Sequence, residues 1–420
     1  MSDLMTLQEI HAIVLANRAP LGAITLESKD ALGYVLAEAV TSRESLPRFA
    51  NSAMDGYAFR SQDGHEDGVS LEVVGSTMAG DERAGTIGLN QAVRIMTGAP
   101  LPEGADAVCM QEEAVEQDGR VIIPRALSLG TNIRLPGEDI REGMEVFPEA
   151  TMLGPVHLGV LAGIGVKTVS VYRRPVVGVL STGDELVDED GYLGPGKIRD
   201  TNRPALLAMV FANGARPLDL GIVGDDDNAL AGAVEDATHR CDMLITSGGA
   251  SYGDRDAIAS ALSMVKGARN IHSIRAAIRP AKPLVFGELG TSRMPVFALP
   301  GNPVSALVAF ELFVKPALRI LAGHREHIER PIGAIAESDF PRSPDGKVHY
   351  VRGHAWIDTA GELRVAASKG QGAHMLLALA HSNALVILEN GNGTDAGERV
   401  ELQLLTQGIA YAPMERSPVR

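Results

Sequence analysis

The chain has few cysteines, few aromatic residues and no long apolar segment, and each shortage excludes a class of protein. Only two cysteines occur in 420 residues, and they lie far apart, so we expect neither a disulfide framework nor a thiolate metal site. The longest apolar stretch, residues 156–171, is interrupted by His157, Lys167 and three glycines, so it does not predict a transmembrane helix. Asp3 stands where a signal peptide has basic residues. We therefore expect a cytoplasmic protein without a membrane partner.

Basic residues are in deficit, since 38 Lys and Arg against 53 Asp and Glu give a formal net charge of −15. A nucleic-acid-binding protein needs a basic surface to neutralise phosphates, so the sequence predicts no nucleic-acid partner. A small anionic substrate stays compatible with this charge. Screening acts over about 8 Å at physiological salt, so a pocket responds mainly to its nearest cations.

Four regions differ in their pattern of apolar residues. Residues 1–45 and 147–174 flank a β-rich insertion, residues 46–146, and form a predicted helical linker region. In the first segment, Thr6 and Glu9 have capping-box spacing ahead of a helix that runs to about Asn17, and residues 29–40 predict a second helix.

The second half of the chain begins with a regular alternation of strands and helices. Residues 175–329 alternate apolar runs with helical segments of 10 to 18 residues, which predicts a mostly parallel, doubly wound α/β sheet with helices on both faces. Short strands return over residues 330–408 and predict a small C-terminal β domain. The fold class is therefore multidomain α/β plus β.

Three strands of the α/β region end in loops rich in glycine and hydroxyl groups. Each loop by itself is most simply a turn, but three of them at one sheet edge favour a ligand site, because free backbone N–H groups at helix N-termini bind phosphates. Pro303 suits the first turn of the last helix, and Asn302 can cap it. The candidate ligand-binding residues are Ser181, Thr182, Gly183, Ser247, Gly248, Gly249, Ser251, Pro300, Gly301, Asn302, Pro303 and Ser305.

Carboxylates accompany these loops. Glu185 and Asp256 belong to two of the loops, and Asp225 begins an Asp-Asp-Asp run ahead of another helix. Mg²⁺ takes one or two protein carboxylates together with substrate oxygens, so Glu185, Asp225 and Asp256 are candidate metal ligands. For residues 225–227 the simpler interpretation is negative charge that complements a helix dipole.

A basic, proline-flanked segment offers cations for an anion. Arg279 and Lys282 lie in the run Arg-Pro-Ala-Lys-Pro, whose prolines restrict the backbone. A cation about 4 Å from an oxyanion contributes roughly 4 kcal/mol at an effective dielectric constant of about 20. The alternative is a solvated basic turn. Arg352 is a further, weaker candidate.

The glycine loop after the strand at residues 243–245 also admits a different enzyme class. Residues 249–253 match G-x-S-x-G, the nucleophile elbow of serine hydrolases, with Ser251 as nucleophile. No His-Gly-Gly-Gly segment, which supplies an oxyanion hole in that class, occurs upstream. The hydrolase is therefore the alternative hypothesis.

Several segments together resemble the MoeA/gephyrin family, the molybdopterin molybdenumtransferases. The resemblance runs in order from about residue 7 to 405. The segments that carry it are Asn51–Ala58, Met96–Ala99, Gly104–Val108, Ser181–Leu186, Ser247–Asp256 and Leu299–Ser305.

The resemblance implies four domains, of which the α/β domain is MogA-like, and a homodimer whose active cleft is shared between the subunits. It implies insertion of molybdate into adenylylated molybdopterin, with Mg²⁺-dependent release of AMP. Asp55 and Thr97 would act on the adenylyl phosphate from the partner chain, beside Glu185, Asp225 and Asp256. Arg279, Lys282 and Arg352 would bind molybdate. A MogA-type adenylyltransferase and molybdoenzyme maturation proteins are the implied partners.

The chain departs from the family pattern in the implied molybdate site. Lysine usually stands where this chain has Arg279, and a serine usually lies in the segment that here contains Ala373. Arginine is a broader, forked donor, and alanine donates no hydrogen bond from its side chain. A non-catalytic scaffold is a third hypothesis, because gephyrin-like members also bind partner proteins and a fold alone does not establish activity.

Overall fold

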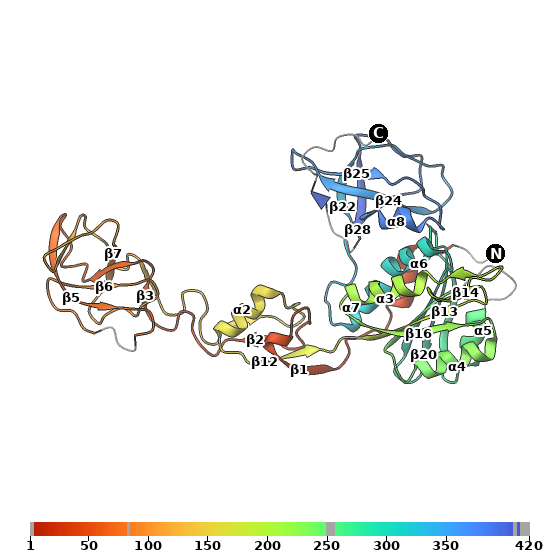
Figure 1. The fold of residues 1–420 in the computed structure, drawn as a ribbon, viewed down its shortest axis with the longest axis horizontal. Coiled ribbons are helices and arrows are strands. Elements are labelled where there is room, and N and C mark those ends of the chain that lie inside the picture. The colour runs from red at the N-terminus through yellow and green to blue at the C-terminus, as the bar shows by residue number, and fades with distance from the viewer. Residues whose placement is uncertain (1–3, 82–84, 249–256, 406–409, 412–420) are drawn as a thin grey trace. The chain divides into compact units, whose positions relative to one another are not determined.

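The protein is represented by a computed structural model that describes residues 4–81, 85–248, 257–405 and 410–411. The chain forms two compact units, shown in Figure 1. Residues 25–171 make up one unit, and residues 1–24 together with 172–420 make up the other. The finer division into four regions stays a prediction. Among the residues with described positions, no helix is both long and apolar enough to span a bilayer.

The unit of residues 25–171 contains a six-stranded sheet of order β7-β4-β6-β5-β9-β8. β5 and β6 are parallel, and the other neighbours are antiparallel. The β-branched runs predicted in this region overlap these strands, because their alternate side chains face apolar clusters on the two sides of the sheet. The strands are β4 Gly56–Phe59, β5 Val69–Thr77, β6 Gln91–Ile95, β7 Ala107–Met110, β8 Val115–Gln117 and β9 Arg120–Ile123.

The rest of this unit is mixed helix and strand. The helix α2 (Pro155–Gly163) packs in an apolar cluster with short two-stranded sheets nearby in the chain. These pair β1 (Ala23–Glu27) with β12 (Thr168–Tyr172), β2 (Val40–Thr41) with β11 (Glu145–Phe147), and β3 (Asn51–Ser52) with β10 (Ile133–Arg134).

The prediction of a helix over residues 29–40 is wrong. Only one 3₁₀ turn, η1 (Ser28–Asp30), forms there. Beyond it the backbone pairs with a distant segment: Gly33 N donates to Leu153 O at 2.8 Å, and Leu36 N donates to Thr151 O at 2.9 Å. These non-local hydrogen bonds satisfy the backbone in an extended form, which local helix propensity does not anticipate.

The N-terminal helix of the other unit follows its sequence signal. α1 spans Leu7–Val14, and the capping box between Thr6 and Glu9 is present in both directions. Glu9 N donates to Thr6 Oγ1 at 3.3 Å, and Thr6 N donates to Glu9 Oε2 at 2.8 Å. The predicted helix start is therefore confirmed.

The α/β part of this unit is a six-stranded sheet of order β16-β13-β17-β21-β20-β18. The first four strands are mutually parallel, and β20 is antiparallel to both of its neighbours. The mostly parallel sheet is confirmed, while β18 and β20 were not predicted. The strands are β13 Val176–Thr182, β16 Arg216–Val223, β17 Met243–Ser247, β18 Arg269–Arg275, β20 Pro283–Leu289 and β21 Met294–Leu299. β14 (Leu186–Val187) and β15 (Ile198–Arg199) form a separate parallel pair.

Helices cover both faces of this sheet, as predicted. α4 (Asp227–Ala237) and α5 (Ala257–Met264) pack on one face around Leu180 and Leu244. The other face is covered by α1, α3 (Asn202–Ala212), α6 (Pro303–Ala309) and α7 (Lys315–Leu321).

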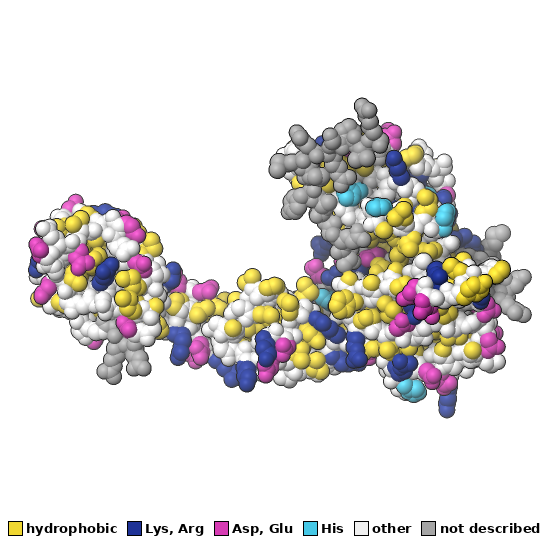
Figure 2. Space-filling model, viewed as in Figure 1, with side chains coloured by type: hydrophobic (Ala, Val, Ile, Leu, Met, Phe, Trp, Pro, Cys, Tyr) yellow, Lys and Arg dark blue, Asp and Glu magenta, His cyan; other side chains and the backbone are white. Residues whose placement is uncertain are grey.

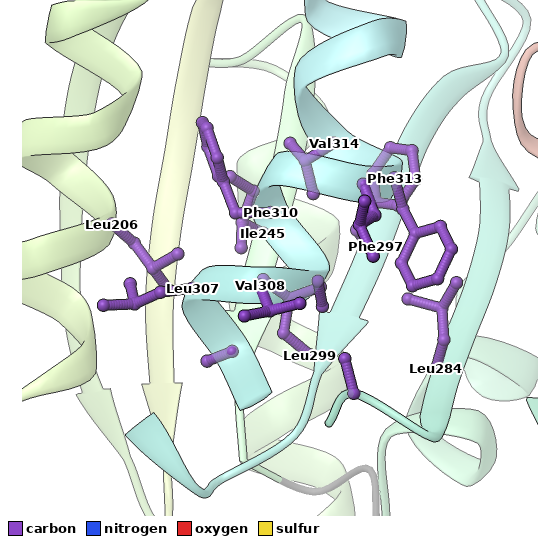
Figure 3. Packing of buried hydrophobic residues seen from close by; sticks show 14 of the residues in the cluster. Leu206, Ile245, Leu284, Phe297, Leu299, Leu307, Val308, Phe310, Phe313 and Val314 are labelled. Atoms are coloured by element: carbon purple, nitrogen blue, oxygen red, sulfur yellow. The ribbon is translucent and has the colours of Figure 1, made fainter. Parts of the chain in front are cut away.

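The segment predicted as one helix over residues 304–321 contains a π-helical stretch. This stretch, η2 (Phe310–Val314), joins α6 to α7. In Figure 3, Phe310 and Phe313 lie against the sheet residues Ile245, Phe297 and Leu284. The side chains of α6 and η2 that face the sheet are apolar and almost fully buried. Their close packing fixes the position of α6 relative to the ends of β17 and β21.

The C-terminal part is a closed ring of strands. β24 pairs with β25 and β26, β26 pairs with β28, β28 pairs with β22, and β22 pairs with β25. β19 (Ile278–Arg279), which comes from the α/β segment, extends the same sheet by pairing with β24. The remaining elements are β22 Ile332–Ala336, β23 Phe340–Pro341, β24 Val348–Ile357, β25 Leu363–Ala367, α8 Leu376–Ala380, β26 Ala384–Leu388, β27 Gly393–Thr394, β28 Arg399–Leu404 and β29 Ala410–Tyr411.

Candidate functional site

The three predicted glycine loops converge at the carboxyl edge of the α/β sheet. Gly248 N donates to Leu299 O at 3.2 Å, which joins the ends of β17 and β21. Thr182 Oγ1 lies 3.5 Å from Ser247 O, which joins β13 to β17. A Cβ atom placed on Gly301 would lie 3.9 Å from the Cα of Gly248. The structure therefore brings together the described loop residues that the sequence selected from three separate strands.

The individual loop residues differ in exposure. Ser181, Thr182, Gly183, Ser247 and Ser305 are buried, whereas Gly301 and Asn302 are exposed. Gly249 and Ser251, the latter the nucleophile of the hydrolase hypothesis, lie outside the described residues.

The helix that follows the β21 loop begins as the sequence predicts, with one difference. Pro303 occupies the first turn of α6, and Asn302 occupies the N-cap position. The Asn302 side chain makes no capping hydrogen bond, so the predicted cap contact is wrong. Its side chain instead remains exposed at the mouth of the loop.

Two of the predicted acidic residues lie at the same edge. Asp225 N donates to Asp184 Oδ1 at 3.1 Å, so the acidic run ahead of α4 contacts the loop after β13. Glu185 is exposed, and its carbonyl oxygen accepts from Ile198 N at 2.8 Å. Asp226 caps α4 by accepting from Ala229 N at 2.8 Å, which confirms the helix-terminal role expected for this run.

The predicted metal ligands are only partly within the described structure. Asp256, the third of them, lies outside it. Among the residues whose side chains are described, no three His, Cys, Asp or Glu side chains form a metal-binding group. Figure 2 shows acidic side chains on the visible face of the α/β part, in keeping with the net negative charge of the chain.

The predicted cations line one pocket of about 850 Å³, formed by the α/β segment and the C-terminal ring of strands. Arg279, Lys282 and Arg352 all border it, and Ser305 borders it from α6. Because Ser305 is also part of the β21 loop segment, the pocket adjoins the glycine loops through α6. Arg279 is exposed at the end of β19, and Lys282 is half-buried.

Arg352 is much more buried than a surface cation, with 1% of its area exposed. Its guanidinium donates from Nη2 to the carbonyl oxygens of Gly370 at 2.7 Å and Gly372 at 3.2 Å. Burial lowers the pKa of Arg352 from its ordinary value. Its Nε is buried and has no hydrogen-bond partner among the described residues. Arg352 therefore forms part of the pocket wall and is held there by the carbonyl oxygens of Gly370 and Gly372.

The loop that contains Ala373 is held by hydrogen bonds to Arg352 and to Val304. Gln371 Nε2 donates to Arg352 O at 2.9 Å, and Gln371 Oε1 accepts from Arg352 N at 3.1 Å. Val304 N donates to Ala373 O at 3.0 Å, which connects this loop to the first turn of α6. The Gln371 contact could not be predicted from the sequence, because nothing local signals a partner 19 residues away.

Asp55 and Thr97 form a hydrogen-bonded pair in the unit of residues 25–171. Asp55 Oδ1 accepts from Thr97 N and from Thr97 Oγ1, both at 2.7 Å. These two bonds, the backbone one first, lower the pKa of the Asp55 carboxyl from its ordinary value. The pair predicted from two separate motifs is thus a local unit, with the carboxylate kept ionised.

We expect Thr97→Val to raise the pKa of Asp55, because it removes the hydroxyl donor and keeps the backbone donor. A carboxyl whose folded pKa is depressed adds stability above its unfolded pKa, and that stability is lost as pH falls through the folded pKa. The variant should therefore lose less stability on acidification than the native chain. NMR titration of the Asp55 carboxyl carbon measures the shift, with Thr151→Val as control, since Thr151 Oγ1 donates to a backbone carbonyl instead. An unchanged Asp55 titration would contradict the assignment.

Comparison with known proteins covers nearly the whole chain. Residues 5–165 match the family model described as MoeA N-terminal region (domain I and II), and residues 334–405 match MoeA C-terminal region (domain IV). Between them, residues 178–320 match a probable molybdopterin binding domain.

Curated relatives and solved structures agree with this pattern. A Molybdopterin molybdenumtransferase of Haemophilus influenzae is 38% identical over 381 residues, which cover 90% of this chain and 93% of the relative. One from Staphylococcus aureus is 32% identical over 405 residues, with 94% of each chain covered. The crystal structure of a molybdopterin biosynthesis moeA protein from Pyrococcus horikoshii superposes with a TM-score of 0.82 at 28% identity and covers 96% of this chain and 100% of that one.

Proposed function

The chain belongs to the MoeA family of molybdopterin molybdenumtransferases, and from that premise we propose that it inserts molybdate into adenylylated molybdopterin and releases AMP. The substrate class follows from the family, and the details of the reaction are the proposal. The observation that carries it is the convergence of the three glycine loops next to a pocket that Arg279, Lys282 and Arg352 line.

The two parts of the site suit the two substrates. Gly248 and Gly301 lie side by side at this edge, and because neither has a side chain, the phosphate of a nucleotide-linked pterin can approach the backbone closely there. The pocket cations attract an oxyanion in a partly desolvated space, where charge interactions are stronger than in water. Ser305 borders this pocket from the helix that the β21 loop begins, so both substrates would meet at α6.

We propose that the pocket orients molybdate through donors of different rigidity. Arg352 is fixed by its bonds to Gly370 and Gly372, whereas Arg279 is exposed and presents a forked guanidinium. Ala373 contributes its backbone rather than a side-chain hydroxyl. The two departures from the family pattern are Arg279 in place of a lysine and Ala373 in a segment that usually contains a serine. Arg279 partly compensates for the missing hydroxyl donor, because its guanidinium carries more N–H donors than a lysine and lines the same pocket as Ala373.

Mg²⁺ fits the acidic edge as a cofactor. Glu185 is exposed and Asp225 lies beside the same loop, and their hard carboxylate oxygens are the ligand type that Mg²⁺ prefers. When bound, the ion would neutralise charge on the adenylyl phosphate. Glu185 and Asp225, with Asp256, would hold it and leave positions for substrate oxygens.

We further propose that the active form is a homodimer with a shared cleft. Asp55 and Thr97 would approach the adenylyl phosphate of the partner subunit, with Asp55 ionised because of its two bonds from Thr97. A MogA-type adenylyltransferase would supply the substrate, and molybdoenzyme maturation proteins would receive the product. We place these reactions in the cytoplasm.

The decisive experiment measures AMP release from adenylylated molybdopterin by the purified protein. We expect release to require both molybdate and Mg²⁺, and Glu185→Gln to slow it by at least about tenfold, because the neutral amide is a weaker metal ligand. Glu189→Gln, in the exposed loop that follows, is the matched control and should keep full activity.

The same assay separates the alternatives. A protein that binds the adenylylated pterin but never releases AMP would support the scaffold hypothesis. Covalent labelling of Ser251 by a fluorophosphonate would support the serine hydrolase. Replacing molybdate with tungstate in the assay shows which oxyanion the pocket prefers.

A further inference from the structure

A short segment at the start of α3 contacts two of the glycine loops of the candidate site. We define it as the α3 entry segment, residues 200–203. Asp200 Oδ1 accepts from the backbone N–H groups of Asn202 and Arg203, each at 3.1 Å, and so caps the start of α3. Asp200 and Asn202 are both buried. These capping hydrogen bonds lie within the segment itself, so they hold its backbone independently of the glycine loops.

Asn202 connects two of the glycine loops with one amide group. Its Nδ2 donates to Ser247 Oγ at 2.7 Å and to the carbonyl oxygen of Gly301 at 2.8 Å. Ser247 ends β17 directly before Gly248, and Gly301 lies in the loop after β21. Because the amide group is planar and both bonds are short, it fixes the separation of these loops.

Arg203 extends the same segment to the other side of the edge. It donates to both carboxylate oxygens of Asp219 on β16, each at 2.6 Å, and it forms an ion pair with Asp188 beyond β14. The segment thus joins β16 and the chain after Glu185 to the loops that follow β17 and β21.

The buried amide oxygen of Asn202 is unfavourable for the stability of the fold. Its Oδ1 is buried and has no hydrogen-bond partner among the described residues. An unsatisfied buried acceptor is costly, so a residue serving packing alone would be expected to avoid it. Asn202 therefore contributes mainly through the two hydrogen bonds that its Nδ2 donates, and both go to the glycine loops of the candidate site.

We propose that Asn202 is a positioning residue that sets the affinity for the nucleotide-linked substrate by holding the Ser247–Gly248 and Gly301 loops at a fixed separation. The identity of the ligand rests on the proposed function. The separation of Gly248 from Gly301 sets how closely a phosphate can approach the backbone at this edge, and Asn202 acts through these loops without contacting substrate.

The test uses three variants of the full-length protein. Asn202→Ala removes both bonds, Asn202→Asp keeps the shape but replaces the donor with an acceptor, and Asn213→Ala is the control. Asn213 lies at the other end of α3, where Nδ2 donates only to Met209 O at 2.8 Å. KM and kcat for adenylylated molybdopterin, the Kd for AMP by calorimetry and the Tm are measured for each.

We expect both Asn202 variants to raise KM and the Kd for AMP by about tenfold, as the loss of two hydrogen bonds implies, with kcat changed by less than about threefold. Asn213→Ala should leave KM, kcat and Kd at native values. The same result for alanine and aspartate would show that the donor matters and not the volume of the side chain.

A purely structural role predicts a different outcome, in which the Tm falls while KM and Kd stay native, and that result overturns the proposal. AMP binding keeps the test independent of turnover. If the native protein binds AMP but releases none, the proposed reaction fails while the Asn202 variants still decide the inference. If the native protein neither binds AMP nor turns over, both proposals fail.

Discussion

Gly248→Ala should abolish AMP release, with a loss of at least about 100-fold, because it distorts the centre of the glycine loops. Gly248 has φ of +94°, a conformation that L residues with a side chain rarely adopt. A Cβ atom at this position would lie 2.8 Å from Thr182 Oγ1 and closer still to the Thr182 carbonyl oxygen. The loops after β13 and β17 would have to separate.

The same substitution should lower the free energy of unfolding by about 3 kcal/mol, since backbone strain and overpacking each cost about 1–3 kcal/mol. The matched control is Gly232→Ala. Gly232 lies inside α4, and an added Cβ atom there meets nothing within 4 Å.

Chemical denaturation of both variants, together with the AMP assay, measures these effects. The control should be stabilised by about 0.5–1 kcal/mol, because alanine favours a helix more than glycine does. Near-native activity of Gly248→Ala would mean that the loops do not depend on their observed close approach, and the ligand site would have to be placed elsewhere.

Arg352→Met should both destabilise the C-terminal ring of strands and weaken molybdate binding. Its guanidinium is almost fully buried and donates to two carbonyl oxygens, which would lose their partner. Since a hydrogen bond from a charged group contributes about 1.5–3 kcal/mol, we expect a loss of about 2–4 kcal/mol in the free energy of unfolding. The KM for molybdate should rise by at least about tenfold, because the pocket also loses a cation.

Arg279→Gln separates the two roles of the pocket arginines. Arg279 is exposed, so its substitution should raise the KM for molybdate while the free energy of unfolding stays within about 0.5 kcal/mol of native. Arg43→Gln, at an exposed position of the other unit, is the control for loss of an exposed arginine, and it should change neither quantity. If Arg352→Met destabilises the chain and leaves the KM for molybdate unchanged, the residue supports the pocket without binding the oxyanion.

The fold could be predicted where local sequence signals agreed with the tertiary environment. The capping box at Thr6, the alternation of strands and helices from β13 to α7, and the β-branched runs of the six-stranded sheet were all readable. The strand β18 was missed because its sequence, Arg269–Arg275, is largely polar and lies at the sheet edge, where apolar periodicity is weak. Residues 29–40 were misread because their hydrogen-bond partners lie more than 100 residues later in the chain.

The candidate site divides in the same way. The glycine loops and their hydroxyl groups could be selected from sequence, because parallel strands place their carboxyl ends at one edge. Asn202 could not be selected, since it carries no motif of its own and its importance depends on two loops 45 and 99 residues away. Likewise the burial of Arg352 follows only from closure of the strand ring around β24.

The sequence by itself identified the family, the glycine loops that follow three strands and most of the strands and helices of the α/β part. It could do so because glycine turns, helix caps and apolar periodicity act over a few neighbouring residues. The tertiary structure decided which of those residues meet. The separation of Gly248 from Gly301 depends on the pairing of β17 with β21 and on the contacts of Asn202, which join segments far apart in the chain. The tethering of the Ala373 loop to α6 and the pocket shared by Arg279 and Arg352 form only where the α/β segment and the C-terminal ring pack together.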